Sequence, residues 1–358
     1  MRPYILAIRK FMIAVAWLCA AGCVASQSLA NFYQGAPKPL SASEVVPALI
    51  QLKQGVAAGL PPPFEVEGVR LFAVKSTGSG LLPLAAEEIV LHPGSTLTMS
   101  AGNSGTGQTD RSIYIVARRL RVLPGDRPAT ITWQRPDAIA TYPPPVGKAS
   151  PGRAGTSSGE PGSMGAAGAA GNAGFAGQGA PTVYLAVQEI VGGTVFFDLR
   201  GQDGGPGGQG QDGGDGGPGL NGAPGSPSLF DCKRGGGNGG RGGKGGDGGV
   251  GGVGGKGGDG GTLVLMSSGE ALRAIQGSVK VQVSGGSGGP GGRGGIKGSG
   301  GPGGQGGSGA GLCGGGSAGG PGGRGEDGGN GGGGEQGQFG AVIAVPLSTA
   351  NVEAVGLK

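Results

Sequence analysis

Glycine at two of every three positions is the sequence feature that most constrains the fold of this chain. From Gly235 to Gly261 the sequence reads GGGNGGRGGKGGDGGVGGVGGKGGDGG, and the third residue is a charge, an amide or a valine. Three residues per turn is the geometry of polyproline II, in which every third residue lies on the same edge of the helix. Glycine edges let neighbouring chains approach closely, and their buried backbone groups need lateral partners. The tract therefore predicts packed polyglycine-II helices whose third residue, x, faces water, with Gly alone structurally required.

Period-three tracts form three inserts between strand-like segments, and Gly and Pro together supply 119 of the 358 residues. The second and third inserts each consist of two periodic limbs around a non-periodic break, SLFDCKRG (228–235) and AGLCGGGSAG (310–319). Limbs of similar length predict that each insert runs out and back, and the third insert changes register at Lys297. A collagen trimer and disordered Gly-rich loops are the alternatives, since Gly loses the most entropy on ordering.

The rest of the chain has the period-two pattern of half-buried β-strands. Val279, Val281 and Val283 alternate with Lys280 and Gln282, which places the valines on one face of a strand. The segments also resemble one another: YIVARRLRV (114–122) is similar to YLAVQEIV (184–191), and GGTVFFDL (192–199) to GSVKVQV (277–283). We therefore predict an all-β fold, a short β-solenoid stem of four or five rungs that carries the Gly-rich bundle as inserts. A β-sandwich stem is the alternative.

These patterns divide the chain into successive segments. They are a signal peptide (1–22), a linker (23–63), β rungs (64–150), Gly-rich insert 1 (151–181), a β rung (182–200), Gly-rich insert 2 (201–261), a β rung (262–284), Gly-rich insert 3 (285–340), and a terminal strand and tail (341–358). The linker is expected to contain a short helix at 41–55, in which Pro47 fits only the first turn.

The N-terminus predicts export. A basic region ending at Lys10 precedes an apolar run too short to span a membrane, as in secretory signals. The sequence AAGC (20–23) resembles a bacterial lipobox, which would place a lipid on Cys23 and anchor an outer-membrane lipoprotein at the cell surface. Cleavage after Ala30 would instead give a secreted protein. The net charge of +5 falls to +2 once the three cations of this segment are removed, and no basic stripe with interleaved aromatics indicates a nucleic-acid partner.

Catalytic, metal and cofactor sites find little support in the sequence. The single histidine, His92, excludes a His dyad or a His metal cluster. The stretch 242–250 resembles a calcium-binding nonapeptide, but Gly occupies the eighth position, where that repeat needs a large apolar residue. We interpret Asp247 and Asp259 as solvated x residues. The arginines at 118, 119 and 121 are interpreted as a solvated strand face. The chain is expected to be no enzyme and to hold no cofactor.

The Gly-rich tracts, about 150 residues, resemble those of bacterial exported glycine-rich, collagen-like proteins. They are also similar to packed GGx helices such as those of springtail antifreeze proteins and the tip adhesins of certain phages. The resemblance implies a rigid surface or extracellular element, with the x residues as a contact face, and implies no site residues. The expected function is a structural or adhesive protein of the cell envelope with a surface or matrix partner of unspecified chemistry. An ice-binding or other flat-surface ligand-binding protein and a collagen-like trimer are the alternatives.

Cys232 and Cys313 are the only cysteines beyond the signal region, and each occurs in a break of the triplet pattern. Cys232 lies 31 residues beyond Gly201, and Cys313 lies 28 beyond Gly285. Side-by-side inserts would bring both thiols to nearly the same height, and disulfides persist in exported proteins. We therefore predict a disulfide between the two tips.

Overall fold

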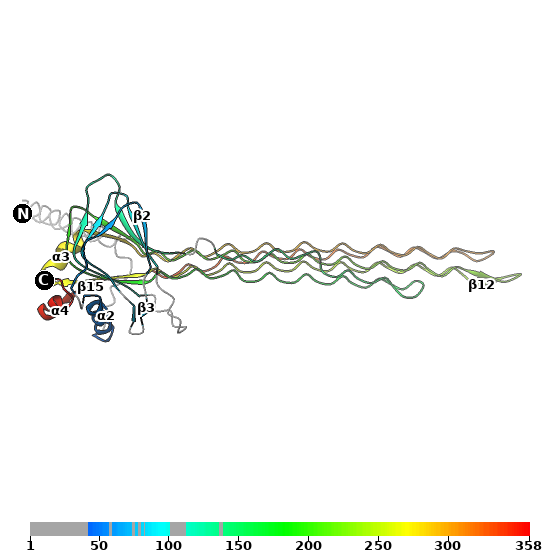
Figure 1. Cartoon of the computed structure of the whole chain (residues 1–358). Helices are drawn as coiled ribbons and strands as arrows, with labels where there is room; N and C mark the ends of the chain where they lie inside the picture. The colour runs from blue at the N-terminus through cyan, green and yellow to red at the C-terminus, as the bar shows by residue number, and fades with distance from the viewer. Residues whose placement is uncertain are drawn as a thin grey trace, which may run out of the picture.

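The structure is a computed structural model that describes residues 42–56, 59–73, 76–77, 80–81, 83–100, 112–135 and 139–358. The sheets and helices gather at one end of the molecule, which we call the stem (Figure 1). The Gly-rich inserts leave the stem in one direction and run side by side as a long, thin projection. The chain therefore has two parts of different physical character, one built on apolar packing and one on glycine.

The stem contains two large sheets in which every strand pair is parallel. The six-stranded sheet has the order β1 (Phe64–Val66), β5 (Leu84–Leu91), β7 (Ser112–Val122), β9 (Thr182–Val191), β13 (Thr262–Ser268) and β15 (Val342–Leu347). The five-stranded sheet has the order β14 (Val279–Gln282), β10 (Val195–Asp198), β8 (Ala129–Trp133), β6 (Thr96–Ser100) and β2 (Val69–Ala73). Two small antiparallel pairs are β3 (Ser76–Thr77) with β4 (Gly80–Leu81), and β11 (Ser226–Pro227) with β12 (Cys232–Arg234).

Successive strands alternate between the two sheets. β7 lies in the first sheet, β8 in the second, and β9 returns to the first beside β7. Parallel neighbouring strands cannot be joined by a hairpin. The chain therefore passes through a strand of the other sheet before it adds the next strand to the first sheet. The sequence likenesses give the register: Tyr114 pairs with Tyr184, and their rings stack with centroids 5.0 Å apart. Val195 likewise pairs with Val279. The prediction of a sheet-rich fold is confirmed.

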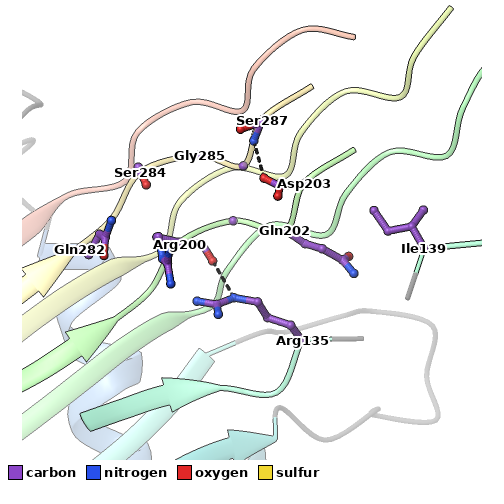
Figure 2. Close-up of a pocket in the computed structure, with 11 residues that line it drawn as sticks. Arg135, Ile139, Arg200, Gln202, Asp203, Gln282, Ser284, Gly285 and Ser287 are labelled. Atoms are coloured by element: carbon purple, nitrogen blue, oxygen red, sulfur yellow. Dashed lines mark hydrogen bonds between the residues drawn. The ribbon is translucent and has the colours of Figure 1, made fainter. Parts of the chain in front are cut away.

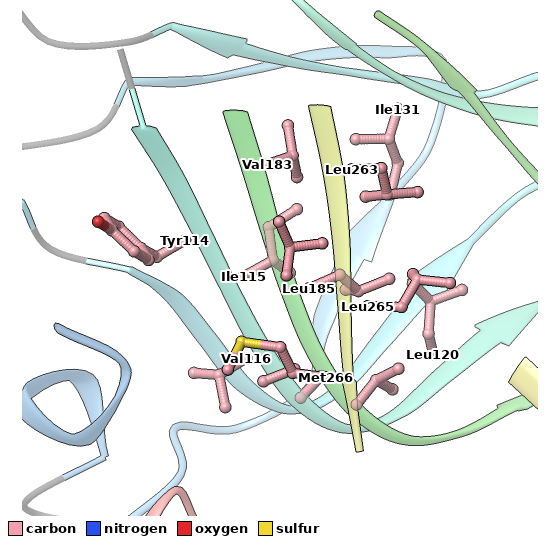
Figure 3. Packing of buried hydrophobic residues seen from close by; sticks show 14 of the residues in the cluster. Tyr114, Ile115, Val116, Leu120, Ile131, Val183, Leu185, Leu263, Leu265 and Met266 are labelled. Carbon is pink, nitrogen blue, oxygen red and sulfur yellow. The ribbon is translucent and has the colours of Figure 1, made fainter. Parts of the chain in front are cut away.

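Rows of apolar side chains at matching register form the core between the sheets. Ile115, Leu185 and Leu265 are paired across three neighbouring strands and are at most 1% exposed (Figure 3). In the second sheet Ile131 pairs with Phe197, and both are buried. Full burial of such a side chain contributes about 1.5–3 kcal/mol, so the repeated rows stabilise the stem.

The helix α2 (Ala42–Gly55) covers part of this core. Leu49 and Leu52 are buried, and the helix packs against β7. A helix was predicted at 41–55, but Pro47 was expected only within the first turn. The helix begins at Ala42, so Pro47 lies in its second turn.

Two further helices, which the sequence analysis did not predict, lie near the C-terminus. Within the segment 262–284, predicted as a β rung, α3 (Gly269–Gly277) separates β13 from β14. The Ser268 side chain caps α3 by accepting a hydrogen bond from the Ala271 N–H, and Leu272 and Ile275 are buried one helical turn apart. The predicted tail contains α4 (Thr349–Ala354), capped by Ser348. Both helices begin at a serine because its hydroxyl satisfies an N–H group that the first helical turn leaves open.

Candidate functional site

The projection, which we call the shaft, is the most distinctive candidate functional element. Five long limbs build it: limb A (159–180), limb B (201–225), limb C (236–261), limb D (285–309) and limb E (314–340). Limbs B and D run outward from the stem, and limbs A, C and E return to it (Figure 1). The second and third inserts thus run out and back, as predicted. Insert 1 also has an outward part, a short outer segment (148–155) that bonds to limb B.

Limb C lies at the centre of the shaft and bonds to all four other limbs. The Gly242 N–H donates to Gly320 of limb E (3.0 Å), and the Gly243 N–H donates to Gly217 of limb B (2.8 Å). The carbonyls accept in turn: that of Gly243 from limb D (2.9 Å) and that of Lys244 from limb A (2.9 Å). The pattern repeats every three residues along the limb. Backbone groups that a Gly-rich loop would leave to water are therefore paired between limbs, as buried groups generally must be.

Steric crowding explains why both Gly residues of a triplet are needed in limb C. A Cβ on Gly242 would lie 1.9 Å from the Gly301 carbonyl oxygen, and one on Gly243 would lie 1.9 Å from that of Ser163. Limb E lies at the edge and needs only one Gly per triplet. A Cβ on Gly322 would meet a carbonyl oxygen at 1.8 Å, whereas nothing lies within 4 Å of a Cβ on Gly323. A limb with more neighbouring limbs thus requires more glycines per triplet.

Limb B shows the same rule within one limb. A Cβ on Gly214 or Gly217 would lie 2.0–2.1 Å from a carbonyl oxygen of the short outer segment. The equivalent positions on either side hold the larger residues Gln211 and Leu220, and glycine returns at 205 and 208, where Cβ atoms would meet other neighbours. Gly214 and Gly217 are therefore required at the heights where the outer segment packs.

Aspartate and asparagine at x positions bond to the adjacent limb, which corrects the interpretation of Asp247 and Asp259 as merely solvated. The Asp247 Oδ1 accepts the backbone N–H of Glu326 (2.8 Å), and the Asp259 Oδ1 accepts that of Gln338 (2.9 Å). Seven such bonds link limb B to D and limb C to E, from the acceptors Asp203, Asp212, Asp215, Asn221, Asn238, Asp247 and Asp259. The x position is therefore exposed and yet structurally used.

Proline follows the same register. Limb B residues accept from limb D residues 84 positions later, as Asp215 does from the Ser299 N–H (2.8 Å). At that separation Pro218 faces Pro302, and Pro206 faces Pro290. Proline has no N–H group, so no side-chain acceptor is required at these two heights. Pro thus occurs opposite Pro at these two heights, and at the heights of the hydrogen bonds above a carboxylate or amide occurs opposite an N–H group.

These hydrogen bonds lower the pKa of several carboxylates. For Asp215, the Ser299 N–H has the largest effect on the pKa and Lys148 adds to it. For Asp247, the Glu326 N–H is the main cause of the lowered pKa. Hydrogen bonds that favour the charged carboxylate lower its pKa, so these contacts weaken when the acids are protonated.

Lys297 takes the place of a glycine in limb D, and the register does not change there, contrary to prediction. The Gly298 and Gly301 N–H groups on its far side keep the limb C partners that the triplet pattern assigns. The Lys297 N–H donates to Asp327 Oδ1 and its Nζ to Oδ2, both at 3.0 Å. The Asp327 pKa is lowered, first by the backbone bond and then by the Lys297 side chain. A side chain is accommodated here because limb E supplies a matching carboxylate.

The outer end of the shaft is closed by the predicted disulfide. Cys232 and Cys313 are bonded, with Cα atoms 4.9 Å apart. Cys232 belongs to the hairpin of β11 and β12, which replaces the triplet pattern at the break in insert 2 (Figure 1). Cys313 lies in the turn between limbs D and E, and its N–H donates to the Ala310 carbonyl. The two tips are therefore tied together.

A cleft of about 590 Å³ lies where the shaft joins the stem (Figure 2). Arg135 and Arg200 on its wall both bind the carboxylate of Asp198, at 2.7 Å and 2.8 Å. Burial raises the pKa of Asp198, but the Arg200 hydrogen bond and the two positive charges outweigh it, and the pKa lies below its usual value. The Trp133 Nε1–H donates to the Arg200 carbonyl (3.0 Å). Since one carboxylate binds both guanidinium groups, we interpret the wall of the cleft as the set of contacts that holds the shaft against the sheet.

Cys23 and both cleavage positions are outside the described residues. His92 and the three arginines that the sequence singles out lie in the stem. His92 contacts Glu65 through Nε2 (2.7 Å). The three arginines of β7 pair with glutamates of neighbouring strands: Arg118 with Glu87, Arg119 with Glu189, and Arg121 with Glu88.

Metal-binding side chains do not gather in groups of three or more anywhere in the described part of the chain. Among the same residues, no helix is both long enough and apolar enough to cross a membrane.

The comparisons with known proteins give little support for a family. No family model matches the chain, and no curated protein matches it. Among solved structures, the chain is similar to a springtail antifreeze protein from Granisotoma rainieri, described as a nine polyproline type II helical bundle. The match has 27% identity, covers 53% of this chain and 96% of that chain, and has a TM-score of 0.07. At that score it carries no argument about fold or function.

Proposed function

We propose that the protein is an exported structural or adhesive element of the cell surface, in which a β-solenoid stem bears a rigid polyglycine-II shaft. The observation that carries the proposal is the bonding of limb C to all four other limbs. Unbonded Gly-rich chain is the most flexible polypeptide available. Lateral bonds at every triplet make it straight instead.

The length of the shaft supports a role in reaching outward. Limbs of about 25 residues, at about 3.1 Å per residue, extend roughly 80 Å from the stem. Such a projection exposes side chains along its flanks and at its tip, and it leaves the stem free to remain at the cell surface. The tip disulfide suits an oxidising compartment outside the cytoplasm.

Surface display and adherence test the proposal together. Trypsin added to intact cells that express the protein should cleave after Lys233 or Arg234, which are exposed at the tip. Those cells should also adhere to cell layers or matrix-coated surfaces better than cells displaying Gly246→Val, in which a Cβ would lie 1.9 Å from the Ala166 carbonyl oxygen. Lys244→Gln, at a half-exposed x position, is the matched control. Cleavage that requires broken cells, or equal adherence of all variants, would reject the proposed function.

A further inference from the structure

The tip hairpin presents two large apolar side chains to solvent. Leu229 and Phe230 are 93% and 91% exposed, among the highest values for large apolar residues in the described chain. They are the central residues of the turn between β11 and β12. We infer that this tip is a membrane-docking element that inserts Leu229 and Phe230 into bilayers with anionic headgroups. The inference rests on the proposed function, because the shaft must hold the tip away from the stem.

The turn is built so that its apolar residues face outward. Ser228 and Asp231 flank them and bond to each other: the Ser228 N–H donates to the Asp231 carbonyl (2.8 Å), and the Asp231 N–H donates to the Ser228 Oγ (3.1 Å). The Asp231 carboxylate also accepts the Cys232 N–H (2.7 Å). Hydrogen bonds of Ser228 and Asp231 thus stabilise the turn, and the turn holds the two apolar side chains exposed to solvent.

The disulfide adds a third apolar side chain to the same end. It joins the hairpin to the neighbouring turn, where Leu312, next to Cys313, is 77% exposed. Exposed apolar residues that gather in one place indicate an interaction site, whereas scattered ones do not. Val250 and Val253 on the side of the shaft are only 56% and 53% exposed and provide an internal comparison.

Charge next to the apolar residues indicates a lipid surface as the occupant. Lys233 and Arg234 follow the turn on β12, and both are exposed. These two cations outnumber the one nearby carboxylate, Asp231, so positive charge predominates at the tip. Apolar side chains flanked by Lys and Arg suit an interface in which the former enter the acyl boundary and the latter meet anionic headgroups.

Vesicle binding tests the inference with the full exported chain. The wild type should sediment with vesicles of phosphatidylcholine mixed with phosphatidylglycerol and bind pure phosphatidylcholine more weakly. Leu229→Ser combined with Phe230→Ser should weaken binding to the mixed vesicles about a hundredfold, since full burial of each side chain accounts for a factor of about ten or more. Lys233→Gln with Arg234→Gln should abolish the preference for the anionic lipid.

The control and a spectroscopic readout keep the test independent of folding. Val250→Ser with Val253→Ser, on the side of the shaft, should leave vesicle binding unchanged. Phe230→Trp should show a blue shift and quenching by brominated lipid on binding. Absence of wild-type binding to mixed vesicles, or equal weakening by the shaft control, would overturn the inference. Loss of cell adherence in the Leu229/Phe230 variant without any vesicle binding would indicate a protein receptor and also overturn it. Trypsin cleavage on intact cells would still decide the proposed function separately.

Discussion

Two adjacent glycines of limb E provide the sharpest test of the packing rule. A Cβ on Gly322 would lie 1.8 Å from the Gly243 carbonyl oxygen, whereas one on Gly323 would have nothing within 4 Å. Real Cβ contacts essentially never fall below 3.0 Å, so Gly322→Ala must displace limb E by about 1.2 Å. Gly323→Ala requires no movement. The two variants differ by one position and share the same composition.

The displacement acts on the hydrogen bonds nearest the substitution. The Gly322 N–H donates to Gly301 (2.8 Å), and Gly320 accepts from Gly242 (3.0 Å). Losing both would cost about 2 kcal/mol, at about 1 kcal/mol each. Replacing Gly by Ala also restricts the unfolded chain, which stabilises by about 0.4–1 kcal/mol. Gly322→Ala should therefore destabilise the shaft by about 1–2 kcal/mol, and Gly323→Ala should stabilise it by up to about 1 kcal/mol.

Thermal melting measures this difference, followed by the circular dichroism band expected of the polyglycine-II limbs that we propose. At about 2–4 °C per kcal/mol, the two variants should differ in melting temperature by several degrees. Trypsin cleavage after Arg324, an exposed residue beside both positions, should be faster in Gly322→Ala. Equal melting temperatures and equal cleavage would show that limb E does not pack as described. They would also contradict the rule that limbs with more neighbours require more glycines per triplet.

The remaining predictions concern the carboxylates, the tip and the anchor. Asp247→Ala should speed hydrogen exchange at the Glu326 amide, and Asp247→Asn, which retains an acceptor, should change it little; equal exchange in both would contradict the bond. The lowered pKa values of Asp215 and Asp247 mean that their contribution is present above the unfolded pKa of about 3.9 and is lost as pH falls through the lowered folded pKa. The shaft should therefore melt earlier in strong acid, and less so when both residues are Asn; a pH-independent melt would refute this. Cys232→Ser should destabilise the shaft by up to about 4 kcal/mol, the chain-entropy contribution of closing a loop of this length, and an unchanged melting temperature would count against that role. Cys23→Ser should release the protein from membranes, unless the wild type is already soluble.

Local sequence patterns predicted the strand-rich stem and the link between the shaft tips. The similarity of 114–122 to 184–191 agrees with the observed register, in which Tyr114 pairs with Tyr184. The cysteines were placed at matching heights because period three keeps each limb straight, so distance along the chain measures distance along the shaft.

The missed features depend on contacts between residues far apart in sequence. The bond from Glu326 to Asp247 spans 79 residues and exists only because limbs C and E lie side by side. The period-three pattern does not say which limbs are neighbours. From the sequence alone, Asp247 could therefore face water as well as bond to limb E. The helix α3 was different, because its signals were local: a serine cap at Ser268 and apolar residues at 272 and 275. They were obscured by the apolar strands on either side.

The fixed separations between bonded limbs restrict how the length of this protein can change over evolution. Limb B residues bond to limb D residues 84 positions later, and limb C residues bond to limb E residues 79 positions later. An insertion of one or two residues in any limb would rotate every later side chain to a different edge. An unmatched triplet would shift each downstream carboxylate past its N–H partner. Lengthening therefore requires whole triplets added at the same height in several limbs at once, in steps of about 9 Å if the limbs have the proposed polyglycine-II rise. Related proteins with shorter or longer reach should differ by coordinated sets of triplets, and single-limb length variants should be rare.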